Sequence, residues 1–286
     1  MIDESLRLRL ESLNRGPLPT NVVTRAARSP STVAPLQPAK LRSLSSPLCP
    51  GHAKPIPGLI RRGESVVTEA GEHWRVCIAV EDIWPGGERL VLNRWERLAK
   101  QGVPSQFVTS FPQRCVFVDL ETCGLAGSAL FLIGLLRQVD GRLTVELLFA
   151  RNYAEECAVL ASLWQRIDEQ SVIVTFNGKS FDWPMVVDRS RRHLLFRGQR
   201  LPTPNHLDML HPARRRWKKK LPDCKLQTLE QRICGRYRVA DISGSMIPAA
   251  YKEYVRTGFE REMDAVLFHN ALDLVTLLDL AMRLAD

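Results

Sequence analysis

Residues 115–125 read Cys-Val-Phe-Val-Asp-Leu-Glu-Thr-Cys-Gly-Leu. The apolar run 116–118 predicts a buried strand, and the acids Asp119 and Glu121 follow it directly. Side chains two residues apart in a strand lie on the same face, so both carboxylates would share one side of a sheet. Like charges on a buried surface are costly unless a cation lies between them. A hard divalent ion with oxygen ligands, Mg²⁺ or Mn²⁺, is the simplest candidate; the alternative is that both acids merely end the strand at the surface.

The segments that follow this strand predict an α/β domain over residues 114–286. The dipeptide Asp140-Gly141 favours a tight hairpin turn between two apolar strands. In chain order we expect strands at residues 116–118, 130–137 and 143–149, a helix at 154–169, a strand at 172–176, a helix that Ser180 can cap, a strand at 205–210, and helical segments from 210 to the C terminus. This order predicts a ribonuclease H-like fold, with a mixed five-stranded sheet and helices on both of its faces.

The chain before this domain divides into two parts. Nine of the eighteen prolines lie in residues 1–63, together with serines and scattered basic residues, so we expect a mostly disordered, basic tail there. Residues 64–113 contain short apolar runs separated by glycines, including 90–92, and predict a small β-rich lead-in packed on the main domain.

Charge and cysteine content restrict the class of protein. The formal charge of the 286 residues is +9, which favours a polyanionic partner such as nucleic acid. No apolar run approaches the length of a membrane span and the N terminus carries acids, so we expect a cytoplasmic protein without a membrane partner. The seven cysteines are scattered through apolar segments, which favours reduced thiols over a disulfide framework.

Two later segments carry further acids. Asp182 follows the strand at 172–176, after a turn that Asn177 and the following glycine favour. A lone Asp there is also a common residue at a helix start. His269 and Asp273 are four residues apart on a strongly apolar helix, so they share one face, which we expect to point inward.

Together these segments resemble the three exonuclease motifs of the DnaQ-like, or DEDD, nuclease superfamily. Within it, the segments 208–214, 226–230, 241–245 and 247–251 resemble the YprB-like group of ribonuclease H-like domains, over about residues 64–284. The resemblance implies that two divalent ions are bound by four acids, Asp119, Glu121, Asp182 and Asp273. It also implies that a His or Tyr upstream of the last Asp handles the attacking water.

His269 departs from this pattern. The histidine-bearing members of the superfamily usually place the His five residues before the last Asp, whereas here the separation is four, the spacing of the tyrosine-bearing branch. An ordinary imidazole pKa of about 6.5 suits proton transfer near neutral pH. His269 is therefore the candidate general base, with a packed core histidine as the alternative.

The stretch from Asp208 to Arg238 is basic, since it contains ten Lys and Arg residues and only three Asp and Glu residues. We expect this stretch to bind the nucleic acid backbone, against the alternative of a solvated helix face. Asp208 is a fifth ligand, an acid that supports the ligands from behind, or a structural acid. The candidate substrate-binding residues are Asn177, Lys179, Asp208, Arg214, Arg215, Trp217, Lys218 and Lys219, with Trp217 expected to stack on a base.

The leading hypothesis is a two-metal-dependent nuclease, a 3′ to 5′ exonuclease on single-stranded DNA or RNA ends. The alternatives are a catalytically inactive ribonuclease H-like module that binds nucleic acid, and an endonuclease of the ribonuclease H or resolvase type. The presence of all four acids favours an active enzyme.

Overall fold

The computed structural model describes residues 52–53, 55–124 and 127–286. Most of the tail expected over residues 1–63 lies outside this range. Its last residues are described and belong to the folded protein: Leu59 and Ile60 are buried, and Asp264 accepts hydrogen bonds from the backbone amides of Gly58 and Ile60, both at 2.9 Å.

A seven-stranded mixed sheet forms the centre of the molecule, in the order β2-β3-β6-β5-β4-β7-β8. Its strands are β2 (Glu64–Thr68), β3 (Gly71–Ala79), β4 (Cys115–Thr122), β5 (Leu130–Val139), β6 (Arg142–Phe149), β7 (Val172–Thr175) and β8 (Asn205–Asp208). Strand β4 pairs antiparallel with β5 and parallel with β7, and β8 is parallel to β7. The ribonuclease H-like fold is confirmed, and its five predicted strands are β4 to β8.

The lead-in does not form a sheet of its own. Strands β2 and β3 pair with each other, and β3 pairs antiparallel with β6, so both extend the main sheet. The strand expected at residues 90–92 is wrong, because these residues lie inside helix α3 (Gly87–Lys100). Val91 and Leu98 are the buried apolar residues of α3, and their seven-residue separation fits one helix face.

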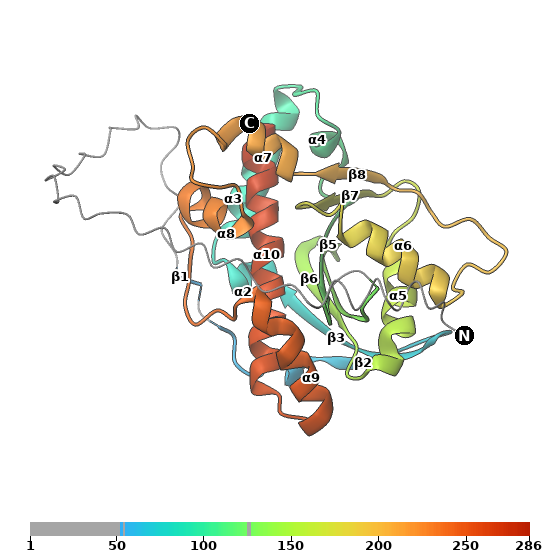
Figure 1. The fold of residues 1–286 in the computed structure, drawn as a ribbon. Coiled ribbons are helices and arrows are strands. Elements are labelled where there is room, and N and C mark those ends of the chain that lie inside the picture. Colours follow the sequence, from blue (N-terminus) through green and yellow to red (C-terminus); the bar gives the residue numbers. More distant parts are fainter. Residues whose placement is uncertain (1–51, 54, 125–126) are drawn as a thin grey trace, which may run out of the picture. The chain divides into compact units, whose positions relative to one another are not determined.

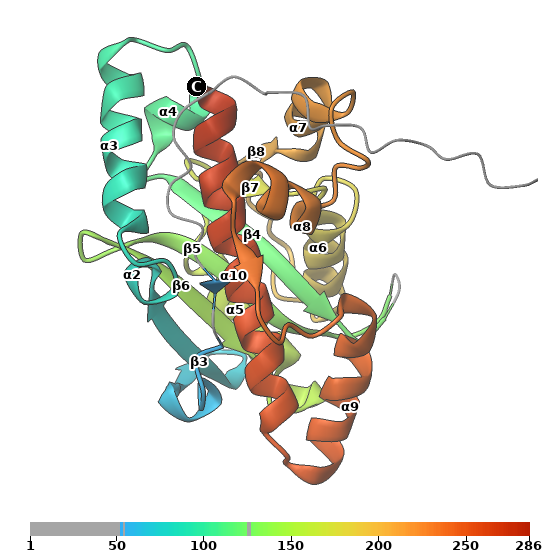
Figure 2. The same cartoon turned by 90° about the vertical axis from the view of Figure 1, so that its left-hand side faces the viewer.

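Helices cover both faces of the sheet (Figures 1 and 2). α5 (Glu156–Trp164) packs on strands of one face, and α6 (Asp182–Arg192) packs beside it. α10 (Arg261–Ala285) packs on β4, β5 and β6, with α3 and α9 against it. The remaining elements are β1 (His52–Ala53), η1 (Ile60–Arg62), α2 (Val80–Ile83), α4 (Gln106–Ser110), η2 (Tyr153–Glu155), α7 (Leu210–Trp217), α8 (Leu226–Leu229), the π-helix η3 (Glu230–Cys234), β9 (Tyr237–Arg238), η4 (Gly244–Met246) and α9 (Ile247–Thr257). β1 and β9 pair as a separate two-stranded parallel sheet.

α10 is the long central helix of the fold. Among the described residues it is the one helix with the length and hydropathy of a membrane span, and 89% of that apolar window is buried inside the protein. A core helix of a soluble domain gives the same signal. The apolar residues of α10 are explained by packing on the sheet.

Gly134 allows α10 to lie close to the sheet. It is opposite Asp119 in the β4–β5 ladder, and a Cβ there would be 1.7 Å from Asn270 Oδ1 and 2.9 Å from Leu274 Cδ1. Both neighbours are fully buried on α10, so neither has room to move. A glycine at position 134 is therefore needed for the contact between α10 and the strand that carries the acids.

We predict that Gly134→Ala lowers the free energy of unfolding by about 1 to 3 kcal/mol, because the added methyl group overpacks this contact. Urea unfolding followed by circular dichroism measures the change. Gly244→Ala is the matched control, since a Cβ at Gly244 meets no atom within 4 Å. Equal stabilities for the two variants would contradict this account of Gly134.

Candidate active site

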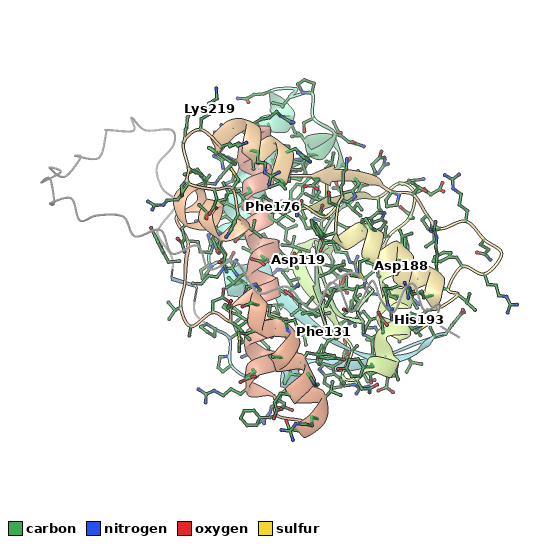
Figure 3. The ribbon with its side chains drawn as sticks, in the orientation of Figure 1. Asp119, Phe131, Phe176, Asp188, His193 and Lys219 are labelled. Atoms are coloured by element: carbon green, nitrogen blue, oxygen red, sulfur yellow. The ribbon has the colours of Figure 1, made fainter. Side chains whose placement is uncertain are left out.

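Three segments bring the predicted acids to one edge of the sheet. β4, β7 and β8 are parallel, so their carboxyl ends meet at the same edge. Asp119 and Glu121 lie in the carboxyl half of β4, and Asp182 begins α6 in the connection that follows β7. Asp273 reaches the same place from α10, which packs on β4. Figure 3 shows Asp119 beside α10 near the middle of the molecule.

The acids perturb one another strongly. Burial, then the charges of Asp273, Glu121 and Asp182, raise the pKa of Asp119 well above its ordinary value. Burial raises the pKa of Glu121 to about 8, with Asp273 and Asp182 adding to it, against the opposing charge of His269. The pKa of Asp182 rises to about 6, again mainly by burial, although its own backbone amide and that of Leu120 favour the charged form. The four carboxylates thus form one electrostatic cluster, in which burial and mutual repulsion outweigh the nearby positive charges at Asp119 and Glu121.

One amide side chain holds the β4 acids. Asn270 lies between His269 and Asp273 on α10, is fully buried, and donates from Nδ2 to Asp119 Oδ2 at 2.8 Å. Its hydrogen bond also favours the charged form of Glu121. The Oδ1 atom of Asn270 faces Gly134 and has no hydrogen-bond partner within the described part of the chain. Asn270 therefore couples the position of α10 to the position of the acids.

Arg238 supplies positive charge next to the cluster. Its guanidinium donates to Asp273 Oδ1, to Glu230 Oε2 at 2.6 Å and to Asp241 Oδ2 at 3.2 Å. The side chain is 6% exposed, so these contacts act in a medium of low dielectric constant. Although burial disfavours the charged guanidinium, Asp273 and Glu230 outweigh it and raise the pKa of Arg238.

The donor chemistry of the cluster suits Mg²⁺ or Mn²⁺, since all four candidate ligands are carboxylates. Burial and the neighbouring acids raise the pKa values of Asp119 and Glu121, and a cation bound between the acids would favour their ionised forms. Within residues 52–53, 55–124 and 127–286, however, no group of three or more His, Cys, Asp or Glu side chains has an arrangement that could already hold a metal ion. The link between the four acids is therefore electrostatic coupling and proximity, and Asp273 is engaged by Arg238.

Asp208 has a structural role. It is 8% exposed, and its carboxylate accepts hydrogen bonds from the backbone amides of Asn177, Lys179 and Leu210 at 2.8 to 3.1 Å. Asn177 has a φ of 68°, as a tight turn requires. Asp208 therefore holds the turn that precedes Asp182, and its charge adds to the rise in the pKa of Asp182. Of the alternatives left open for Asp208, the structure supports the structural acid.

The candidate substrate-binding residues 214–219 divide into exposed basic side chains and a buried tryptophan. Arg214, Arg215, Lys218 and Lys219 are exposed on and just after α7, which follows β8 and leaves the sheet at the same edge as the acids. Figure 3 shows Lys219 at the outside of the molecule. Trp217 differs from the expectation: it is 8% exposed, packs with a small apolar cluster, and is covered by Arg216 at 5.6 Å. We therefore assign Trp217 to the core and not to base stacking.

Sequence reasoning missed four residues at this site. Arg238, Asp241 and Asn270 contact the candidate residues, and Phe181 precedes Asp182 with 67% of its surface exposed. An exposed Phe next to a candidate ligand was a usable signal. Asp241 lies in the segment 241–245 that resembles the YprB-like group, and Arg238 ends the basic stretch. No local pattern places either one at the acids, because His269, which both contact, is about 30 positions away.

The fold and this acidic site define a ribonuclease H-like protein, and a family model described as the RNase H superfamily matches residues 116–285. The chain belongs to this superfamily. It is also similar to a protein of Bacillus subtilis (strain 168) named "Uncharacterized protein YprB", with 36% identity over 174 residues. That match covers 59% of this chain and 41% of the relative, so the chain spans less than half of the relative's length.

The raised pKa of Glu121 predicts a pH effect on stability without metal. An acid with a higher pKa in the folded than in the unfolded chain destabilises the fold as pH rises between the two values, here from 4.5 to about 8. Glu121→Gln should therefore increase the free energy of unfolding in EDTA, and by more at pH 8 than at pH 5. Urea titrations at both pH values measure this, with the surface change Glu169→Gln as control. The same gain at pH 5 and pH 8 would contradict the proposed coupling.

Proposed function

We propose that the chain is a nuclease that uses two divalent ions, Mg²⁺ or Mn²⁺, to hydrolyse phosphodiester bonds at the 3′ ends of single-stranded nucleic acid. Four carboxylates from β4, α6 and α10 carry this proposal: the charge of Asp273 on α10 raises the pKa of both Asp119 and Glu121 on β4, and so does that of Asp182 on α6. The superfamily supports a nuclease in general, and the resemblance of the three motifs to DEDD enzymes supports attack at a 3′ end.

Asp119, Glu121, Asp182 and Asp273 are the residues that would hold the ions. Two divalent ions in such a site neutralise charge on the phosphate, lower the pKa of the attacking water and stabilise the leaving oxygen. Arg238 donates to Asp273 and Asn270 donates to Asp119, so each of these contacts orients one carboxylate.

His269 is the candidate base for the water. Nε2 of its ring lies 3.4 Å from Asp273 Oδ2. Burial favours the neutral imidazole, but the hydrogen bond to Asp241 and the charges of Asp273 and Glu121 outweigh it and raise the pKa of His269. As water attacks phosphorus, Nε2 accepts one of its protons and the bond from phosphorus to the leaving oxygen breaks. The leaving oxygen takes a proton from solvent water, and the imidazolium returns its proton to solvent, which restores the base.

Two surfaces near the acids suit a single strand. Phe181 exposes its ring beside Asp182, and an exposed aromatic ring can stack on an unpaired base of any sequence. The exposed basic residues of 214–220 suit the phosphate backbone.

The assay uses single-stranded DNA and RNA of equal length, labelled at the 5′ or the 3′ end, with Mg²⁺, Mn²⁺ or EDTA. A 3′ exonuclease releases labelled mononucleotide from the 3′-labelled strand first and leaves circular single-stranded DNA intact. Cleavage of the circle would indicate an endonuclease. Binding without metal-dependent cleavage would indicate an inactive module.

We predict that Asp119→Ala and Asp182→Ala each reduce cleavage to the limit of detection, while the fold is kept or slightly stabilised because repulsion in the cluster falls. Asp188→Ala, on the same helix as Asp182 and paired with Arg192 at the surface, is the control and should retain activity. Thermal melts with Mn²⁺ should show a smaller gain for the two site variants than for wild type. Activity within a few-fold of wild type in either variant would remove these residues from the site.

We predict that the triple substitution Arg215→Ala, Lys218→Ala and Lys219→Ala weakens binding of all sequences to a similar extent. The slope of log affinity against log salt should fall by about one unit per lost phosphate contact at most. A triple variant of exposed basic residues on α3, at Arg89, Arg97 and Lys100, removes the same charge elsewhere and serves as control. Equal slopes for the two triple variants would show that residues 214–220 only face solvent.

A further inference from the structure

His269 is held from one side by a residue with no assigned role. Asp241 Oδ1 lies 2.8 Å from Nδ1 of His269, and the imidazole is 8% exposed. The opposite ring nitrogen, Nε2, faces Asp273 at 3.4 Å. One edge of the ring is thus fixed by Asp241, and the other is directed toward the acidic cluster.

The chemistry of this contact determines which nitrogen carries the proton. Although burial favours the neutral acid, the hydrogen bond to His269 and the neighbouring Arg238 hold the pKa of Asp241 below its ordinary value. Two groups lie against Nδ1 of His269: Asp241 Oδ1 at 2.8 Å, which can only accept, and Arg238 Nη1 at 3.4 Å, which can only donate. The contact with Asp241 is shorter by 0.6 Å and lies at an ordinary hydrogen-bond distance, so Nδ1 donates to the carboxylate. In the neutral imidazole the proton is therefore on Nδ1, and Nε2 keeps its lone pair.

Asp241 is itself fixed by donors from other elements. Its second oxygen, Oδ2, accepts from Arg238 Nη1 at 3.2 Å and from Gln227 Nε2 at 3.3 Å. Arg238 is anchored in turn by the buried Glu230, which also accepts from Thr276 of α10 at 2.9 Å. Both oxygens of Asp241 therefore have assigned partners, and the carboxylate cannot rotate without losing them.

We propose that Asp241 is a positioning residue that sets the tautomer and orientation of His269, so that Nε2 is a proton acceptor in the active site. Its importance for turnover rests on the proposed nuclease function. The setting of the tautomer depends only on the contacts of Asp241. A core ion pair would stabilise the fold equally well but would not require Nε2 to be free of a proton.

Asp241→Asn is the sharpest test, because the donors around Oδ2 determine which way the new side-chain amide is oriented. Two donors, Arg238 and Gln227, face that position, so the amide carbonyl must occupy it. The amide NH₂ then faces Nδ1 of His269 and donates to it, which places the ring proton on Nε2. The variant keeps the size of Asp241 but imposes the opposite tautomer, which cannot accept a proton from water.

Asp279→Asn is the matched control. Asp279 is 2% exposed, lies on α10 ten residues after His269, and pairs with Arg283 and Arg236 without touching the imidazole. Its substitution removes a buried charge of the same kind, and so reports the effect of lost stability alone.

Two measurements are made on wild type and both variants. Steady-state cleavage of end-labelled single strands separates kcat from KM. The ¹⁵N spectra of ¹⁵N-histidine-labelled, metal-free protein, at a pH where His269 is neutral, report which ring nitrogen is protonated, with His269→Gln used to assign the signals. We expect wild type to be protonated on Nδ1 and Asp241→Asn on Nε2, with kcat lower by about 10²-fold or more and KM within threefold.

Each outcome bears on one claim. A kcat of Asp241→Asn within threefold of Asp279→Asn, or wild-type His269 protonated on Nε2, overturns the role of Asp241. If wild type cleaves no strand, the proposed function fails, and the ¹⁵N spectra still decide whether Asp241 sets the tautomer. If Asp241→Asn does not fold, the wild-type spectrum alone gives that decision.

Discussion

The placement of four partly buried carboxylates side by side is the constraint on which the rest of this structure depends. Removal from water and mutual repulsion both favour the neutral acids, as the pKa values of about 8 for Glu121 and about 6 for Asp182 indicate. Few groups oppose this: Arg238 at Asp273, Asn270 at Asp119, and backbone amides at Asp182. Such a cluster weakens the fold, so the surrounding apolar core must prevent the acids from separating.

The required rigidity comes from one helix and one strand. α10 carries His269, Asn270 and Asp273 within five residues, so their relative positions are fixed by helix geometry. β4 carries two of the other three acids, Asp119 and Glu121, within three residues. The helix and the strand are in contact, and Gly134 on the neighbouring strand leaves space for Asn270 to reach Asp119. A displacement of α10 would therefore move three site residues at once.

Much of this arrangement follows from local sequence. Apolar runs predicted β4 to β8, and the hairpin turn has positive φ at both Asp140 and Gly141, as that dipeptide favours. The spacing of two residues placed Asp119 and Glu121 on one face of a strand. The spacing of four residues placed His269 and Asp273 on one face of a helix. The pairing of β3 with β6 was not predictable, because it joins residues about 70 positions apart and no local pattern encodes such a register. Trp217 was misread because a basic run hides the apolar face of α7, on which Ala213 and Trp217 are four residues apart and both buried.

The connection from β8 to α10 explains why Arg238 and Asp241 escaped sequence reasoning. Its elements before α9 are short: α8 has four residues, η3 five and β9 two. Such short segments have few internal hydrogen bonds and are not stable alone. They are held against α10 by buried charges, with Glu230 bound to Thr276 and Arg238 bound to Asp273. Asp273 belongs to the acidic cluster, whose mutual repulsion weakens the fold. Its negative charge also binds Arg238 and so holds this connection against α10. Acids and arginine stabilise each other, because either one alone would be a buried charge without a partner.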